Sequence, residues 1–332
     1  MTGASGEAST AASIAAIVRA GGEHVPELLG AVEEMLREVA AGHGEELGRH
    51  AGSTISAGGK RLRPLLVLLS AGGRTDDERA LVRAAAAVEL IHSATLVHDD
   101  VLDMAPLRRG RPTVFAEGGR AAATQTGDLL FARAFALLAA NGDGEQVRAL
   151  SDASTALARG ELLQRADAWD ASISRERYLL RCELKTAALF QASCELGALA
   201  AGIDGRDALR EFARRIGLAF QVLDDILDVS GPAERTGKHR GTDLLDGTVT
   251  LPFILARRRD PGLEAIEPRS IKTPEQAEEI CDRIAATGAL DEARETALEQ
   301  VAAAKAVLPR TLADRQREAL ELVADSVVAR YS

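Results

Sequence analysis

Aromatic residues and prolines are scarce in this chain of 332 residues. Phe, Trp and Tyr together make up 3% of it, and it has 10 prolines. β-Sheets favour aromatic and β-branched residues, whereas the many Ala and Leu residues here are strong helix formers. Because 46% of the residues are hydrophobic, the chain can bury a large core. We therefore expect an all-α fold.

Cysteine is rare as well. The three cysteines, Cys182, Cys194 and Cys281, have neither the even count of a disulfide framework nor the close spacing of a metal site, and a reducing cytoplasm fits them. Residues 1–20 lack the basic start of a signal peptide. No apolar run approaches the ~20 residues that a membrane span requires. We expect a cytoplasmic protein without a transmembrane segment, whose contact with a membrane would be only transient.

Positive charge is in the minority, with a formal net charge of −10 at pH 7. A nucleic-acid partner would require a net basic face, so this balance argues against one. The basic residues nevertheless gather in two short segments, residues 58–64 and 107–113. Local basic clusters on an acidic protein favour a small anionic substrate.

Two acidic clusters are the most informative feature of the sequence. Asp99, Asp100 and Asp103 form an Asp-Asp-x-x-Asp pattern, which recurs 125 residues later (224 − 99) as Asp224, Asp225 and Asp228. On a helix this spacing places the first and last carboxylates on one face, one turn apart. Such a face is an oxygen-ligand site suited to Mg²⁺, which shares its coordination shell with substrate phosphates. Together with the basic clusters, the pattern predicts a protein that binds two polyanions, one through bridging Mg²⁺ and one through Arg and Lys.

Helical periodicity covers most of the chain. We predict helices over residues 25–51, 75–102, 119–140, 148–167, 175–202 and 206–229, with each acidic cluster at the end of a long apolar helix. Residues 231–247 are Gly-rich and charged, which predicts a loop. No linker divides the chain, so we expect a flexible lead over residues 1–25 and a single helical domain over residues 26–332.

Eight short motifs, in order, resemble those of the trans-isoprenyl diphosphate synthases of the polyprenyl synthetase family. They are Gly-Gly-Lys-Arg-Leu-Arg-Pro from Gly58, His92, Asp-Asp-Val-Leu-Asp with Arg-Arg-Gly from Asp99, Gly127-Asp128, Gly160-Glu161, Lys185-Thr186, Phe-Gln-Val-Leu-Asp-Asp from Phe220, and Gly-Lys-His-Arg-Gly-Thr-Asp-Leu from Gly237. Single acidic triplets occur by chance, but eight ordered motifs are specific. The resemblance implies a bundle of long helices around a central cavity, a homodimer, and head-to-tail condensation of isopentenyl diphosphate with an allylic diphosphate.

The resemblance also assigns site residues. It implies that six carboxylates hold Mg²⁺: Asp99, Asp100, Asp103, Asp224, Asp225 and Asp228. The implied catalytic residues are Asp99, Asp103, Asp224 and Lys185. The implied allylic diphosphate ligands are Arg108, Lys185, Thr186, Gln221 and Lys238. The implied isopentenyl diphosphate ligands are Lys60, Arg63, His92 and Arg109.

Several of these residues have a purely structural alternative. His92 lies on an apolar helix, where a lone histidine is often a core residue. Gln221 could be an ordinary buried amide, and Thr186 could hydrogen-bond within its own helix. Thr248 stands where many relatives carry a lysine, so one cationic contact to the allylic diphosphate is in doubt.

Two other functions remain open. A class I terpene cyclase ionises the same kind of substrate, but such enzymes have a mixed second ligand set and no site for a second diphosphate. A non-catalytic partner subunit usually loses the acidic clusters, and both are present here. Whether the chain needs a partner for activity is not decided by the sequence.

Product length depends on the residues just before Asp99. By the resemblance, the growing chain runs back along that helix, where one turn of about 5.4 Å is close to one isoprene unit. Ala94 and Thr95 are small where short-chain synthases usually place an aromatic ring, and Ile91 is the next bulky residue. We expect a long polyprenyl diphosphate, with geranylgeranyl diphosphate as the alternative if Ile91 blocks the path.

Overall fold

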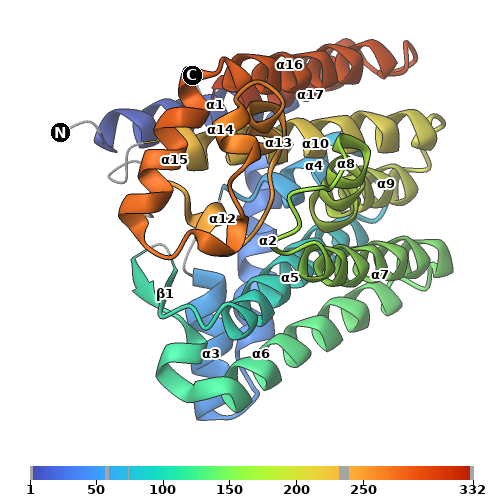
Figure 1. Cartoon of the computed structure of the whole chain (residues 1–332). Helices are drawn as coiled ribbons and strands as arrows, with labels where there is room; N and C mark the ends of the chain where they lie inside the picture. The colour runs from blue at the N-terminus through green and yellow to red at the C-terminus, as the bar shows by residue number, and fades with distance from the viewer. Residues whose placement is uncertain (1–2, 57–59, 74, 109, 232–238, 330–332) are drawn as a thin grey trace.

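Helices make up almost all of the described chain (Figure 1). The computed structural model describes residues 3–56, 60–73, 75–108, 110–231 and 239–329. The helices are α1 (Gly3–Gly21), α2 (His24–Ala40), α3 (Glu45–Ser56), α4 (Leu62–Ser70), α5 (Glu78–Leu102), α6 (Val114–Ala139), α7 (Gly144–Ala166), α8 (Arg175–Cys182), the π-helix η1 (Glu183–Ala187), α9 (Ala188–Ala201), α10 (Arg206–Ser230), α12 (Thr242–Leu245), α13 (Leu251–Arg257), α14 (Pro261–Glu264), the 3₁₀ helix η2 (Pro268–Ser270), α15 (Pro274–Ala286), α16 (Ala289–Val307) and α17 (Asp314–Ala329). The prediction of an all-α fold is confirmed.

A short hairpin follows α5. Strands β1 (Leu107–Arg108) and β2 (Arg111–Pro112) pair antiparallel, with Arg108 opposite Arg111. The hydroxyl of Thr113 donates to the backbone carbonyl of Ala105 at 2.6 Å and accepts from the backbone N–H of Ala116, so it both closes the hairpin and caps α6. The hairpin therefore holds Arg108 close to the end of α5.

Three predicted segments differ from the structure. Residues 25–51 were predicted as one helix, but Gly42 and Gly44, with φ of 82° and 80°, separate α2 from α3. Glycine adopts this left-handed region without the steric penalty of a side chain. Residues 3–21, predicted as part of a flexible lead, form α1, which packs against α17. Within residues 231–247, predicted as a loop, residues 242–245 form α12.

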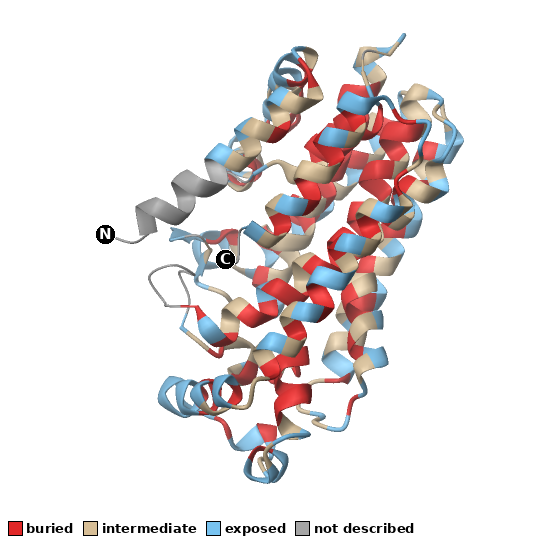
Figure 2. Ribbon diagram, turned by 90° about the horizontal axis from the view of Figure 1, so that it is seen from above, coloured by how far each residue is buried: buried red, intermediate tan, exposed pale blue. Residues whose placement is uncertain are grey.

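The hydrophobic core has two halves that meet at α4 and α9. Leu65, Leu66 and Leu69 of α4 belong to the half built mainly by α8, α10 and α13–α17, whereas Val67 and Leu68 of the same helix belong to the half built by α2, α3 and α5–α7. Figure 2 shows the buried residues running along the long helices and the exposed residues at their ends and outer faces. Helices α4 and α9 are thus covered on both sides.

Helices α4 and α9 approach each other closely because of a glycine. A Cβ atom at Gly197 of α9 would lie 2.1 Å from the backbone carbonyl oxygen of Val67 on α4, far inside van der Waals contact. Any side chain there would push the two helices apart and disturb the packing in both halves of the core.

The two acidic helices belong to different halves of the core. Helix α5 packs on α6 in one half, and α10 packs on α16 and α9 in the other. By length and composition α5 could cross a membrane, which the sequence inspection did not predict. However, 72% of its most apolar stretch is buried inside the fold, as in the core helix of a globular domain.

Candidate functional site

A cavity of about 740 Å³ opens between the two halves of the core and brings together residues of both acidic helices. Its wall includes Asp100 from α5 and Asp224 from α10, with Phe190 and Phe220 as apolar elements. The predicted anion ligands that line it are Lys60, Arg63, His92 and Arg108. Arg109 and Lys238 lie outside the described residues. The cavity therefore joins the basic segment near α4 to both acidic clusters.

The first acidic cluster contains carboxylates in two environments. Asp100 is buried and its Oδ1 accepts from Nε and Nη2 of Arg108, both at 2.8 Å. Asp99 is half-buried and Asp103, the C-cap of α5, is exposed. Burial raises the pKa of Asp99 to about 6, opposed by the Lys185 ammonium. Asp99 therefore carries a carboxylate whose charge is only partly compensated by its neighbours.

Cationic side chains from the next helices surround this cluster. Nζ of Lys185 lies 2.6 Å from Oε2 of Glu161. Arg165 contacts Oε1 of the same Glu161 at 2.9 Å and reaches Oδ1 of Asp103 at 3.7 Å. The carboxylate of Glu161 thus holds two cations next to Asp99 and Asp103.

Lys185 and Thr186 stand on the π-helix η1, between α8 and α9. Single π turns inside α-helices are rare and are frequent at functional sites. Gly160 of α7 makes the approach to this turn possible, because a Cβ atom there would lie 2.6 Å from the backbone nitrogen of Lys185. The sequence indicated both motifs but gave no sign of the π turn.

The second acidic cluster has the same division. Asp225 is buried; its Oδ2 accepts from the hydroxyl of Tyr178 at 2.6 Å and its Oδ1 from the amide of Gln221 at 2.8 Å. Burial raises the pKa of Asp225 to about 7. Asp224 is exposed to the cavity. Asp228 is half-buried and accepts from the backbone N–H of Asp243.

The opposite side of the cavity is basic. Arg63 stacks on Phe190, with its Cζ 4.8 Å from the ring centroid, and its buried Nε has no hydrogen-bond partner among the described residues. Burial lowers the pKa of Arg63 to about 10, opposed by Glu89. A buried N–H without a partner is costly. An anion bound in the cavity would satisfy it.

Arg61 fixes the segment that carries Lys60 and Arg63. Its backbone φ of 47° is left-handed, which is unusual for a residue other than glycine. Its guanidinium donates to Oε1 of Glu33 at 2.6 Å and to Oε1 of Glu89 at 2.7 Å. These ion pairs tie the start of α4 to α2 and α5.

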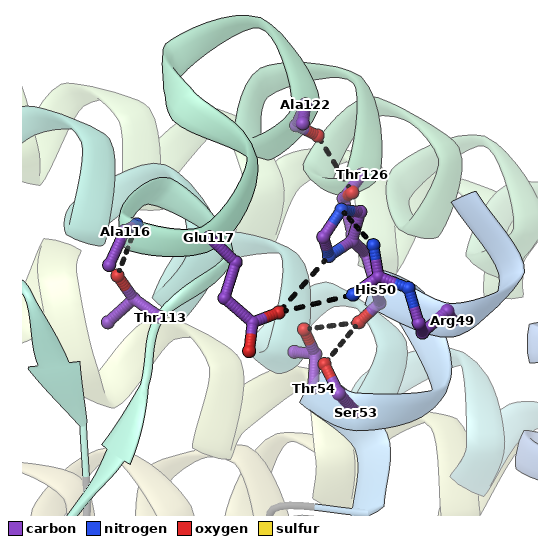
Figure 3. A network of polar contacts seen from close by, with 9 residues as sticks. All are labelled: Arg49, His50, Ser53, Thr54, Thr113, Ala116, Glu117, Ala122 and Thr126. Atoms are coloured by element: carbon purple, nitrogen blue, oxygen red, sulfur yellow. Dashed lines mark hydrogen bonds and ion pairs between the residues drawn. The ribbon is translucent and has the colours of Figure 1, made fainter. Parts of the chain in front are cut away.

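Residues of α3 and of the first turn of α6 also line the cavity. Figure 3 shows the polar contacts of these two helices. His50 of α3 is almost fully buried; its Nδ1 lies 3.8 Å from Oε2 of Glu117 on α6, and Arg49 reaches the same oxygen at 3.4 Å. The hydroxyls of Ser53 and Thr54 donate to the backbone carbonyl of His50. The contacts of Glu117 with His50 and Arg49 hold α3 against α6.

The residues predicted to set product length lie outside the cavity wall. Ile91 and Ala94 are fully buried in the core on α5, and the half-buried Thr95 donates to the carbonyl of His92 at 2.8 Å. The residues of this stretch that line the cavity are Ser93, Leu96 and Val97. The route of the growing chain remains a prediction.

The donor atoms of the site can be compared with the ligands that Mg²⁺ prefers. Among the residues that the structure describes, no three His, Cys, Asp or Glu side chains are close enough to hold an ion by themselves. Mg²⁺ does not need such a cage, because it keeps several waters and binds through one or two carboxylates plus substrate phosphates. The partly compensated Asp99, with Asp103 one turn away and Asp224 on α10, fits an ion held in this manner.

Sequence reasoning did not assign three residues that shape the site: Arg61, Arg165 and Tyr178. Tyr178 carried the clearest signal, because it is one of two tyrosines and precedes Lys185 by seven residues, or two helical turns. Arg61 lies between the predicted ligands Lys60 and Arg63 in the sequence. Only its left-handed backbone and its ion pairs with Glu33 and Glu89 show that it has a structural role instead. Thr248, which replaces the expected lysine, is half-buried and donates its backbone N–H to the carbonyl of Asp243.

The fold and the paired acidic clusters define a class, the all-α enzymes that bind two diphosphates in one cavity. The family model described as polyprenyl synthetase matches residues 44–286. The chain therefore belongs to the polyprenyl synthetase family, as the sequence motifs predicted. It is a prenyltransferase that joins isopentenyl diphosphate head to tail to an allylic diphosphate.

Individual relatives differ in the product that they are named for. The chain is 45% identical over 231 residues to heptaprenyl diphosphate synthase component 2 of Geobacillus stearothermophilus, covering 69% of this chain and 72% of that protein. It is 34% identical over 294 residues to a geranylgeranyl diphosphate synthase of Methanosarcina mazei, covering 86% and 90%. The solved polyprenyl synthase of Caulobacter crescentus, complexed with calcium and isoprenyl diphosphate, superposes with a TM-score of 0.88 at 36% identity, covering 96% of this chain and 98% of that one.

Proposed function

We propose that the acidic side of the cavity binds the allylic diphosphate through Mg²⁺ and that the basic side binds isopentenyl diphosphate directly. Asp99, Asp103 and Asp224 would hold the metal. The cationic and polar side chains facing the same diphosphate would be Arg108, Lys185, Thr186, Gln221 and Lys238, and those facing isopentenyl diphosphate would be Lys60, Arg63, His92 and Arg109.

The observation that carries this proposal is the buried Nε of Arg63, which finds no hydrogen-bond partner within the described part of the chain and lies in a cavity also lined by Asp224. Arginine grips two phosphate oxygens at once, so the basic side can hold a diphosphate without a metal ion. The diphosphate next to carboxylates needs a bridging cation, because carboxylate and phosphate repel each other. This asymmetry separates the substrate that ionises from the one that does not.

The chemistry follows from that separation. The allylic C–O bond breaks heterolytically, and the electron pair leaves with the diphosphate, whose charge is stabilised by Lys185 and Arg108. When bound, Mg²⁺ supplies Lewis acidity to the same leaving group. The π electrons of isopentenyl diphosphate then form the new C–C bond, and the resulting cation loses a proton to the departed diphosphate. Phe190 and Phe220 exclude water from the cation.

We further propose a long polyprenyl product made by a homodimer in the cytoplasm. The small residues Ala94 and Thr95 on the implied path and the likeness to a heptaprenyl synthase component support the long product. The likeness to a geranylgeranyl diphosphate synthase keeps that shorter product as the second candidate. That relative is named component 2 of its synthase, which favours a further candidate: a chain that is active only with a partner subunit.

One experiment separates these candidates. The purified chain would be incubated with isopentenyl diphosphate and farnesyl diphosphate, with Mg²⁺ or with EDTA, and the dephosphorylated products resolved by chain length. Products longer than geranylgeraniol, formed by the chain alone and only with Mg²⁺, would support the proposal. Accumulation of geranylgeraniol would select the shorter product. If the purified protein were inactive although light scattering gave the mass of one or two chains, a partner subunit would be missing.

A further inference from the structure

A chain of hydrogen bonds connects the π-helix to the second acidic cluster and ends at Tyr178. The hydroxyl of Thr186 on η1 donates to Oε1 of Gln221 at 2.6 Å, and the amide of Gln221 donates to Oδ1 of Asp225 at 2.8 Å. The hydroxyl of Tyr178 on α8 completes the chain by donating to Oδ2 of Asp225 at 2.6 Å. Helix α10 is thus linked to η1 through Gln221 and to α8 through Asp225.

Both carboxylate oxygens of Asp225 are occupied inside the protein. Its side chain is buried, and Tyr178 is fully buried beside it. Its neighbour Asp224 faces the cavity instead. Asp225 is therefore an anchor for the end of α10, as Asp100, held by Arg108, is for the end of α5.

We propose that Tyr178 is a positioning residue for the second acidic cluster. By holding Asp225, it fixes the rotation of the last turns of α10 and so aims the carboxylate of Asp224 at the allylic diphosphate. Through Gln221 and Thr186 the same chain keeps α10 in register with η1, which carries Lys185. Tyr178 itself touches neither substrate nor metal. The inference rests on the proposed metal role of Asp224.

A phenylalanine at position 178 would keep the packing and remove only the donor. If Tyr178 acts through Asp225, Tyr178→Phe should weaken metal binding at the allylic side. Loss of a hydrogen-bond partner outside the direct ligands of a metal typically reduces metal affinity by about 10–100-fold. The basic side of the cavity, at Arg63, does not take part in the chain, so binding of isopentenyl diphosphate should be unaffected.

The test compares Tyr178→Phe with Ser193→Ala. Ser193 is also fully buried, but its hydroxyl donates only to the carbonyl of Leu189 in its own helix. The measurements are the Mg²⁺ concentration for half-maximal activity, the KM of isopentenyl diphosphate, and, by calorimetry without turnover, the binding of Mg²⁺ with inorganic diphosphate. In Tyr178→Phe we expect a rise of roughly tenfold or more in the Mg²⁺ requirement, weaker calorimetric binding and an unchanged KM, with no change in Ser193→Ala.

Asp225→Asn tests the route. If Asp225 is the anchor, this variant should shift the Mg²⁺ requirement about as far as Tyr178→Phe does, and the double variant should shift it no further. If Tyr178→Phe does not fold, Asp225→Asn carries the test by itself, with Ser193→Ala as its control. An unchanged Mg²⁺ requirement, an equal rise in the KM of isopentenyl diphosphate, or additive effects in the double variant would each overturn the inference. Wild-type turnover in Asp224→Ala would instead overturn the proposed metal site.

Discussion

Replacing Asp99 by asparagine should stabilise the metal-free protein at neutral pH, although it should abolish efficient turnover. Burial raises the pKa of Asp99 to about 6 in the folded chain, from a usual value of 3.8. The folded state therefore binds the proton more tightly than the unfolded chain does. The stability that comes with the protonated form is fully present below about pH 4 and is lost as the pH rises through 6.

The magnitude follows from this difference in pKa. About two pKa units correspond to about 3 kcal/mol at pH 7.5, which is an upper value for a half-buried side chain. An average unfolding entropy of about 2 cal/mol/K per residue gives roughly 0.7 kcal/mol/K for a chain of this length, so Tm should rise by about 4 °C or less. Asparagine mimics the protonated carboxyl, so the gain should vanish near pH 4.

The assay is thermal unfolding in EDTA at pH 7.5, 5.5 and 4, at one scan rate, for the wild type, Asp99→Asn and Asp103→Asn. Asp103 ends the same helix but is exposed, so solvent screens its charge and Asp103→Asn should change Tm little. Mg²⁺ with diphosphate should reverse the order, because a ligand that binds only the folded wild type stabilises it. An Asp99→Asn protein no more stable than wild type at pH 7.5 would refute the reasoning.

Four further outcomes are expected. Asp224→Ala should reduce turnover by at least about a hundredfold, or roughly 3 kcal/mol of transition-state stabilisation, in a steady-state diphosphate-release assay. Wild-type rates in this variant would show that Asp224 does not belong to the metal site. Lys60→Ala should raise the KM of isopentenyl diphosphate more than that of the allylic substrate, and the reverse order would exchange the two subsites. Gly160→Ala should raise the KM of the allylic substrate and lower Tm, because its methyl group meets the backbone of Lys185; normal values would show that α7 can shift. Ala94→Phe should shorten the products separated by chromatography. An unchanged distribution of product lengths would show that the growing chain does not run past Ala94.

Much of the fold was predictable because helices follow local periodicity. The ends of α5 and α10 were placed within a few residues, since apolar spacing and the acidic clusters both mark them. The interruption between α2 and α3 was missed, because the apolar spacing over residues 25–51 predicted one helix across Gly42 and Gly44. Their left-handed backbone depends on how α2 and α3 pack, which periodicity does not describe.

The site was predictable at the level of motifs and not of orientation. Sequence places Asp224 and Asp225 side by side with equal chemistry, and only the buried Tyr178 and the amide of Gln221 distinguish them. The same holds for Lys60 and Arg61, because the guanidinium of Arg61 turns to Glu33 and Glu89. Contacts between residues far apart in the chain decide which member of a motif faces the substrate.

The π turn at residues 183–187 amounts to one surplus residue in an otherwise continuous helix from α8 to α9. Each residue of an α-helix advances the chain by about 100° around the axis, so the turn offsets the face of α9 relative to that of α8. Tyr178 can thereby face α10 while Phe190, twelve residues on, reaches the cavity. Deleting one residue from this segment would leave the composition almost unchanged. It would, however, rotate every later side chain of α9 around the helix axis, so that each would face a different neighbour. Insertions and deletions here should be far less tolerated than substitutions.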